Sequence, residues 1–259
     1  MFTAGTDCGA KNTRTAIVND GHVIAKSCVL TGFDLIEAID SSFKMALSEA
    51  GLRRDQITAL GLTGSGSAAL SGPYTKVNDV RAMAVASNHL VPSGRTVIDV
   101  GAEEGRVARL NKTGAVLDFA INEKCAAGGG IFIESMARAL DTSLEEIGYL
   151  ALESRASIPM NAQCAIFAES EVISLIHSNV SKSDIARAIH DAMASRIASM
   201  IRRVGCEPEI VMLGGVAHNP GLVTALQREL GVERIIVPDY PEYASAIGAA
   251  LVSAYESRI

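Results

Sequence analysis

Two aspartates, each with a glycine two residues later, are the first residues of this sequence that point to chemistry. Asp7 and Gly9 end one apolar run, and Asp99 and Gly101 end another. Such a turn presents a carboxylate and backbone N–H groups to one point in space, and N–H groups suit phosphate oxygens. Because a carboxylate repels a phosphate unless a cation intervenes, the pair predicts a Mg-nucleotide site in which Asp7 and Asp99 hold the ion through water.

Two glycine segments extend this interpretation. Gly214-Gly215 follows an apolar run, so the backbone there can closely approach a flat group such as adenine or ribose. The triplet at 128–130 precedes a predicted helix, whose N-terminus favours anions. A single Asp-Gly turn is ordinary in hairpins, so the nucleotide interpretation depends on the two matched copies. No G-x-x-x-x-G-K-[ST] loop occurs, which indicates a different mode of ATP binding.

Two cysteines precede predicted helices. Cys125 lies ahead of a helix that begins near Ile131, and Cys164 lies ahead of one that runs to His177. The helix dipole and free N–H groups stabilise a thiolate at such positions, which suits metal ligation. Two cysteines are half of a four-thiolate site, so a [4Fe-4S] cluster would need a second chain across a twofold or pseudo-twofold axis.

The alternative is that both cysteines are small core residues, which cysteine statistics alone favour. The other three, Cys8, Cys28 and Cys206, are assigned to the core on this ground. An odd number of cysteines without a C-x-x-C pair argues against a disulfide framework and for a reducing compartment.

The elements that must position these residues form an internal repeat. After each Asp-x-Gly turn come two short apolar runs, separated by a turn at 19–21 in the first copy and 111–114 in the second. Each copy therefore predicts three strands joined by tight turns. The apolar spacing from Leu35 to Leu47 predicts a helix, and a similar spacing predicts a long helix over 183–204. The run 210–213 predicts a fully buried strand.

Strands followed by helices, twice, predict an α/β protein of two lobes with a nucleotide cleft between them. The boundary is expected near residues 92–94, giving an N-terminal lobe of 1–92 and a C-terminal lobe of 93–259 that carries both candidate ligand cysteines. The C-terminal helix from Tyr243 is a candidate to pack on the first lobe.

Composition argues against several classes of protein. Acidic residues number 29 against 23 Lys and Arg, without a basic run, which argues against a nucleic-acid partner. Hydrophobic residues make up 48%, yet no apolar stretch approaches the ~20 residues of a membrane helix. The first residues lack the basic and apolar regions of a secretory signal, which predicts a cytoplasmic location.

Five segments together resemble the BadF/BcrA-type ATPase family, which comprises activators of 2-hydroxyacyl-CoA dehydratases and ATPase subunits of benzoyl-CoA reductase. The segments are Asp7-x-Gly9, Asp99-x-Gly101, 122–128, 167–174 and 214–219. The resemblance covers nearly the whole chain, and the segments 122–128 and 167–174 are its most specific parts. It implies the duplicated, ribonuclease H-like α/β lobes of the actin, hexokinase and Hsp70-like (ASKHA) ATPase fold.

The resemblance also implies Mg-ATP hydrolysis in the cleft and one [4Fe-4S] cluster at a subunit interface, with Cys125 and Cys164 as this chain's ligands. The implied partners are a second ATPase subunit, either a sister chain or an identical one, an iron–sulfur acyl-CoA reductase or dehydratase component, and a ferredoxin-like electron donor. The residues expected to contact ATP are Gly9, Ala10, Lys11, Asn12, Thr13, Arg14, Gly101, Ala102, Glu103, Gly128, Gly129, Gly130, Gly214, Gly215 and Asn219.

Residues 99–104 depart from the common family form, since they read Asp-Val-Gly-Ala-Glu-Glu instead of Asp-Ile-Gly-Gly-Gln-Asp. This form looks like the smaller ATPase subunit of benzoyl-CoA reductase, so the leading hypothesis is an ATP-driven electron-transfer subunit for the reduction of an aromatic acyl-CoA. Glu103 joins Asp7 and Asp99 as a candidate catalytic residue, because it would either orient the attacking water or repel the γ-phosphate and slow the site.

Two alternatives stay open. One is a homodimeric activator of a 2-hydroxyacyl-CoA dehydratase. The other is a small-molecule kinase, or an ATP-responsive binding module, without a cluster.

Overall fold

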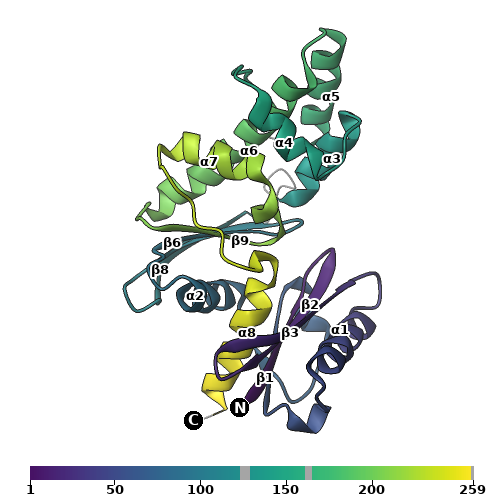
Figure 1. Cartoon of the computed structure of the whole chain (residues 1–259), viewed down its shortest axis with the longest axis vertical. Helices are drawn as coiled ribbons and strands as arrows, with labels where there is room; N and C mark the ends of the chain where they lie inside the picture. Colours follow the sequence, from purple (N-terminus) through teal and green to yellow (C-terminus); the bar gives the residue numbers. More distant parts are fainter. Residues whose placement is uncertain (123–128, 161–164, 258–259) are drawn as a thin grey trace. The chain divides into compact units, whose positions relative to one another are not determined.

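The computed structural model describes residues 1–122, 129–160 and 165–257, which form two compact units (Figure 1). The first unit comprises Met1–Gly94, Leu110–Leu117 and Pro238–Ile259, and the second comprises Arg95–Arg109 and Asp118–Val237. The chain leaves the first unit after Gly94. It returns there twice, with a hairpin tip and with the C-terminal helix.

The first unit is built on a five-stranded sheet in the order β3-β2-β1-β4-β5. Its strands are β1 (Phe2–Cys8), β2 (Asn12–Asn19), β3 (His22–Leu30), β4 (Ala59–Thr63) and β5 (Thr75–Lys76). β2 is antiparallel to both β1 and β3, whereas β4 is parallel to β1. Successive side chains of a strand point to opposite faces of the sheet. A different helix covers each of the two faces.

Helix α1 (Leu35–Ala50) covers one face, where its Phe43 and Ala46 form a core with Ala4 and Ile17 of the sheet. The Asp34 side chain caps the first turn by accepting from the N–H of Glu37 at 2.9 Å. The last turn ends at a glycine in the left-handed conformation, residue 51, with a φ of 66°.

Helix α8 (Ala244–Glu256) covers the opposite face (Figure 1). It approaches so closely that a Cβ at Gly5 or Gly61 would collide with the α8 backbone. A Cβ at Gly248 of α8 would in turn collide with the backbone of α2 (Asp79–Leu90). Glycine is therefore required at these positions for α8 to lie between the sheet and α2.

The second unit repeats this sheet order. Its strands are β6 (Thr96–Val100), β7 (Gly105–Leu110), β8 (Val116–Asn122) and β9 (Ile210–Leu213), arranged β8-β7-β6-β9. β6 is antiparallel to β7 and parallel to β9, as β1 is to β2 and β4. The internal repeat predicted from the Asp-x-Gly turns is thus confirmed at the level of strand order and direction.

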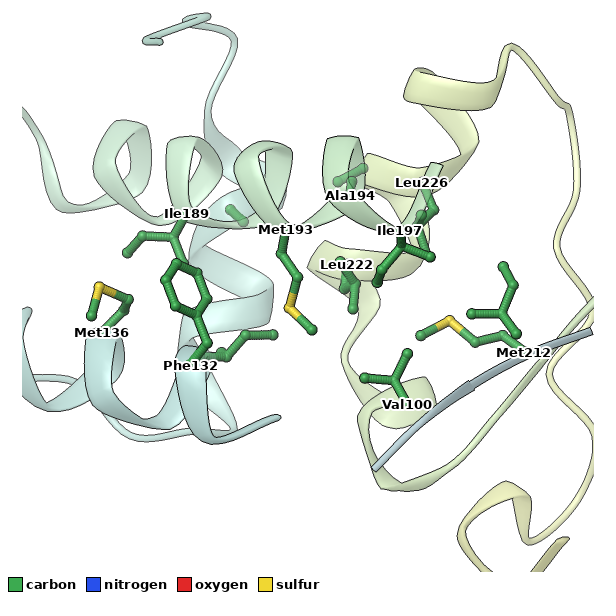
Figure 2. Close-up of a cluster of buried hydrophobic side chains, with 14 of the residues drawn as sticks. Val100, Phe132, Met136, Ile189, Met193, Ala194, Ile197, Met212, Leu222 and Leu226 are labelled. Carbon is green, nitrogen blue, oxygen red and sulfur yellow. The ribbon is translucent and has the colours of Figure 1, made fainter. Parts of the chain in front are cut away.

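The helices of the second unit are α3 (Gly130–Ala139), α4 (Glu146–Glu153), α5 (Ala165–His177), α6 (Lys182–Val204) and α7 (Pro220–Leu230). The helix predicted over 183–204 is α6. Its buried residues, from Ile185 to Val204, belong to the hydrophobic core of the second unit. Figure 2 shows Met193 of this face between Phe132 of α3 and Leu222 of α7. None of the helices formed by the described residues combines the length and apolar character needed to cross a membrane.

Candidate functional site

The two Asp-x-Gly turns have the same local geometry. After β1, the N–H of Gly9 donates to the carbonyl of Asn12 at 3.2 Å, and after β6 the N–H of Gly101 donates to the carbonyl of Glu104 at 2.9 Å. Each bond closes a tight turn directly after the aspartate. The two sheets therefore have the same turn at equivalent places.

A glycine packs against each aspartate from the neighbouring parallel strand. Gly64 follows β4 and Gly214 follows β9, with φ angles of 90° and 84°. A Cβ at Gly64 would collide with the Asp7 carboxylate, and one at Gly214 would lie 2.6 Å from the carboxylate of Asp99. Only glycine tolerates both this conformation and this approach.

The sequence interpretation included Gly214 but missed Gly64. A signal was present, because Gly64-Ser65-Gly66 follows a short apolar run, as Gly214-Gly215 does. Each glycine is followed by a short 3-10 helix, η2 (Ser65–Ala69) in the first unit and η4 (Gly215–His218) in the second. The duplication therefore extends beyond the Asp-x-Gly turns to the elements behind them.

Asp99 is almost fully buried and forms an ion pair that the sequence interpretation missed. The Arg106 guanidinium lies 3.3 Å from the Asp99 carboxylate through Nη1 and 2.6 Å from Glu104 through Nη2. Asp99 and Arg106 face each other across β6 and β7, as Asp7 and Arg14 do across β1 and β2. The register of the repeat was the available signal. A magnesium ion would have to share the Asp99 carboxylate with this arginine.

In the first unit the equivalent arginine lies over an aromatic ring, and a neighbouring lysine lies over another. The Arg14 guanidinium lies 5.9 Å from the centre of the Tyr243 ring, and Lys26 lies 3.4 Å from that of Tyr240. Burial is the largest of the effects that raise the pKa of Tyr243. An uncharged ring face attracts a cation, so Tyr243 attracts the Arg14 guanidinium near the start of β2.

Thr13 is fully buried beneath the first turn. Its hydroxyl lies 3.0 Å from that of Thr31 and 3.5 Å from the sulfur of Cys8, and Thr31 donates to the carbonyl of Gly9 at 2.7 Å. The Thr13 side chain therefore supports the turn from within, and a contact of Thr13 with ATP stays a prediction that would involve its backbone. Ala10 and Lys11 are the exposed residues of this turn.

The glycines before α3 pack on the second turn. The N–H groups of Gly130 and Ile131 donate to the carbonyls of Gly101 and Ala102 at 2.8 and 2.9 Å, and a Cβ at Gly129 would collide with the carbonyl of Ala102. These two N–H groups are thus used within the protein, and a contact of ATP with Gly129 and Gly130 stays a prediction. Gly128 lies outside the described residues.

The two glutamates of the second turn differ in their surroundings. Glu104 is engaged by Arg106, whereas Glu103 is exposed at the tip. Further along the chain, Asn219 ends the segment that starts at Gly214. Its Oδ1 caps α7 by accepting from the N–H of Leu222 at 3.1 Å.

The candidate cluster ligands Cys125 and Cys164 both lie outside the described residues. Within the described ranges, no group of three or more His, Cys, Asp or Glu side chains could hold a metal ion. The assignment of the remaining cysteines to the core is right for Cys8, which is buried, and wrong for Cys28 and Cys206, which are exposed.

Helix α5 has an unusually apolar exposed surface. The side chains of Ile166 and Phe167, in its first turn, are 72% and 71% exposed, and those of Ile173 and Ile176 are 45% and 41% exposed. Only Ala168 and Val172 of this helix are buried. An apolar surface of this kind commonly marks a site of protein association.

Comparison with known proteins identifies the chain's relatives. A model of the BadF/BadG/BcrA/BcrD ATPase family matches residues 4–253. The chain is 34% identical to the 2-hydroxyisocaproyl-CoA dehydratase activator of Clostridioides difficile, over 100% of this chain and 97% of that protein. It is 36% identical to the activator of lactoyl-CoA dehydratase of Anaerotignum propionicum, over 99% and 98%. Identity to the D-type subunit of benzoyl-CoA reductase of Thauera aromatica is 30%, over 98% and 93%.

Solved structures agree with this assignment. Component A of the (R)-2-hydroxyglutaryl-CoA dehydratase of Acidaminococcus fermentans superimposes with a TM-score of 0.95 at 32% identity, covering 100% of both chains. The 2-hydroxyisocaproyl-CoA dehydratase activator of Clostridium difficile, with bound ADPNP, gives 0.92 at 34%, covering 100% and 96%. A ROK family glucokinase of Streptomyces griseus gives 0.61 at 12%, covering 98% and 100%. The last likeness concerns the fold alone and confirms the ASKHA ATPase fold.

Proposed function

The chain belongs to the BadF/BadG/BcrA/BcrD ATPase family, and we propose that it is an ATP-hydrolysing activator that supplies electrons to a 2-hydroxyacyl-CoA dehydratase. The observation that carries this choice is the similarity over whole lengths to two dehydratase activators, at 34% and 36% identity. The benzoyl-CoA reductase ATPase subunit, which the sequence interpretation favoured, matches at 30%. The activator function therefore replaces it as the leading hypothesis.

The Mg-nucleotide is assigned to the two duplicated turns. Asp7 and Asp99 would hold the ion through water, and the exposed Lys11 would offset phosphate charge. Gly214, Gly215 and Asn219 would approach the base or ribose. Catalysis of phosphoryl transfer rests mostly on positioning and electrostatics, and the exposed Glu103 would orient the attacking water. Support comes from the matched turn geometry in both units.

Cys125 and Cys164 would supply two thiolates to a [4Fe-4S] cluster, and a second subunit would supply the other two. Such a group transfers single electrons when bound. The exposed apolar residues of α5, which begins directly after Cys164, fit a subunit interface at this place. An identical partner chain is the simplest source, with a ferredoxin-like protein as electron donor and a dehydratase component as acceptor.

Action on an aromatic acyl-CoA, as an ATPase subunit of a benzoyl-CoA reductase, is the second candidate. Residues 101–104, Gly-Ala-Glu-Glu, favour it, because this form of the second turn looks like the smaller ATPase subunit of that complex. The two candidates differ in the component that accepts the electrons.

The deciding experiment is reconstitution under anaerobic conditions. The purified chain, MgATP and a one-electron donor are combined either with a 2-hydroxyacyl-CoA dehydratase component and its substrate, or with the catalytic subunits of a benzoyl-CoA reductase. We expect ATP-dependent dehydration in the first mixture. Reduction of benzoyl-CoA alone would favour the second candidate, and ATP-dependent phosphorylation of a small molecule in a protein without iron would overturn both.

Variants assign the two sites separately. Cys125→Ser and Cys164→Ser should remove the iron and sulfide, because a hydroxyl is a poor replacement for a soft thiolate ligand. The exposed Cys206 provides the matched control, since Cys206→Ser should leave both in place. Asp7→Asn should impair ATP hydrolysis while the iron content stays unchanged. Retention of iron by the Cys164→Ser protein would contradict the ligand assignment.

A further inference from the structure

A carboxylate at the start of α2 bonds to the strand before the helix. Asn78 already caps α2, because its side chain accepts from two N–H groups of the first turn. The side chain of Asp79, the first residue of the helix, reaches back to the end of β4. Its Oδ1 accepts from the hydroxyl of Thr63 at 2.5 Å and from the N–H of Gly64 at 2.8 Å. Asp79 therefore holds the residue that follows β4.

The two bonds fix the backbone where β4 ends. Both donors bond to a carboxylate, and such bonds are shorter and stronger than those between neutral groups. Thr63 is fully buried, so water cannot replace Asp79 as the acceptor for its hydroxyl. Because the donors belong to consecutive residues, they fix the last side chain of the strand and also the direction of the chain at Gly64.

Gly64 is the residue that lies against Asp7. A Cβ there would collide with the Asp7 carboxylate and with the carbonyl of Cys8, so the backbone of Gly64 limits where that carboxylate can turn. Thr63 faces Asp7 in the parallel pairing of β1 and β4. A series of contacts therefore connects Asp79, through the end of β4, to the aspartate of the first turn.

The second unit holds its aspartate differently. Asp99 faces Leu213 in the pairing of β6 and β9, so the position equivalent to Thr63 has no hydroxyl to donate. The Asp99 carboxylate is paired with Arg106. The two turns thus have the same backbone geometry, but different side chains fix their aspartates.

We propose that Asp79 is a positioning residue, which fixes Gly64 against the Asp7 carboxylate and thereby sets the direction of that carboxylate for nucleotide binding. The inference rests on the proposed function, because it assigns Asp7 to the Mg-nucleotide. In this role Asp79 acts through Gly64 and does not itself contact the nucleotide. What the role requires of Asp79 is an acceptor oxygen in the right place.

Replacing Asp79 separates the acceptor from the charge of its side chain. Asp79→Asn keeps a carbonyl oxygen that can accept both bonds, whereas Asp79→Ala keeps no acceptor. We expect Asp79→Ala to weaken MgATP binding about tenfold, the effect of one hydrogen bond to a charged group, and Asp79→Asn to weaken it by less than about threefold. In hydrolysis the loss should appear mainly in KM, because the substitution disturbs binding and not the reacting atoms.

Two further positions provide the matched comparisons. Thr63→Val removes one donor and Thr63→Ser keeps it, so the Val variant should bind MgATP more weakly than the Ser variant. Thr58 donates to the carbonyl of Phe2 at 2.8 Å, at the opposite end of the same strand pair. Thr58→Ala therefore loosens β1 and β4 away from Asp7, and it should change MgATP binding by less than about twofold.

Calorimetric titration with MgATP measures these affinities, and hydrogen exchange of the Gly64 amide gives a readout without nucleotide. We expect exchange at Gly64 to be at least about fivefold faster in Asp79→Ala than in Thr58→Ala, because only the first variant removes the acceptor of this amide.

Several results would overturn the proposal. Equal losses of affinity in Asp79→Asn and Asp79→Ala would show that the charge itself is needed, and an equal loss in Thr58→Ala would show general loosening of the sheet. Unaltered exchange at Gly64 in Asp79→Ala would show that the contact does not fix this residue. Equal binding by Thr63→Val and Thr63→Ser would count against it even if Asp79→Ala failed to fold. Absence of MgATP binding by the unchanged protein would instead refute the proposed function.

Discussion

Equivalent residues of the two units have different surroundings at the same register. Asp99 and Arg106 form a buried ion pair, whereas the Arg14 guanidinium packs on Tyr243. The sequence predicted that both aspartates end a strand, because the Asp-x-Gly pattern is local. It did not predict the partners of these side chains. Tyr243 is far away in the chain from Arg14, and the pairing of Asp99 with Arg106 follows from the register of β6 and β7.

Arg106→Met should lower the free energy of unfolding by about 3 kcal/mol, because it removes the guanidinium that pairs with the nearly buried carboxylate of Asp99. Denaturant unfolding of the second unit measures the change. Arg138→Met is the control, since Arg138 is exposed and its pair with Glu134 on the same helix should contribute at most about 0.5 kcal/mol. Equal stability of the two variants would show that Arg106 does not stabilise Asp99.

His190, which is fully buried in α6, gives the protein a defined response to mild acid. Burial lowers its pKa in the folded state, so below pH ~6.5 the unfolded chain binds a proton that the folded chain does not, and stability falls as the pH falls. Melting temperatures at pH 7.5 and 5.5 should therefore differ less for His190→Gln than for the unchanged protein. Glu146 and Asp184, whose pKa values are lowered by hydrogen bonds, lose their contribution only at more acidic pH. An unchanged difference in the variant would contradict the assignment to His190.

Long, strongly patterned elements were predictable from the sequence. Helix α6 has a buried residue at every third or fourth position, and its predicted range differs from the observed one by a single residue. Helix α5 has no such one-sided pattern, because its apolar residues lie on exposed as well as buried faces. The close packing before α3 was not predictable, since a glycine run is equally typical of an anion site.

The glycines behind the two aspartates should be among the least replaceable in the chain. Gly64→Ala adds a Cβ that collides with the Asp7 carboxylate and the carbonyl of Cys8. Gly214→Ala adds one that collides with the Asp99 carboxylate and the carbonyl of Val100. Both positions also have a positive φ, which strains any residue with a Cβ. Gly231→Ala is the matched control, because φ is also positive there, at 66°, yet nothing lies near the added Cβ. We expect about 1 kcal/mol of destabilisation from Gly231→Ala and a larger loss from the other two, with reduced MgATP binding.

Thermal unfolding and MgATP titration of the three proteins measure these effects. A Gly64→Ala protein as stable as Gly231→Ala would mean that the Asp7 turn has room to move. That result would weaken the assignment of this turn to a precisely shaped phosphate site.

At the scale of the whole chain, the duplicated lobes were predicted correctly, since a repeat of strand order can be recognised without any knowledge of side-chain packing. The choice between a dehydratase activator and a benzoyl-CoA reductase subunit was harder to predict from the sequence. Residues 101–104 suggested a benzoyl-CoA reductase ATPase subunit, whereas similarity over the full length favours the activators. A four-residue turn constrains one step of the chemistry, while the partner is selected by surfaces spread over the chain.

The first unit should not fold from its contiguous N-terminal segment. A fragment of residues 1–94 lacks α8 and exposes the sheet face that contains Gly5 and Gly61. We expect this fragment to remain unfolded or to aggregate, and a version joined by a flexible linker to residues 238–259 to recover a cooperative unfolding transition. Circular dichroism with thermal melting distinguishes the two. A cooperative transition in the short fragment would show that α8 is dispensable.

The return of α8 also has a consequence for biosynthesis. A ribosome makes the chain from the N-terminus, so β1 and β4 leave the exit tunnel before the second unit, whereas the helix that covers them follows it. The second unit, which lies between them in the sequence, can complete its own core first. During translation the face of the N-terminal sheet that α8 later covers is therefore exposed to solvent. A chaperone that binds nascent chains would have to shield this face.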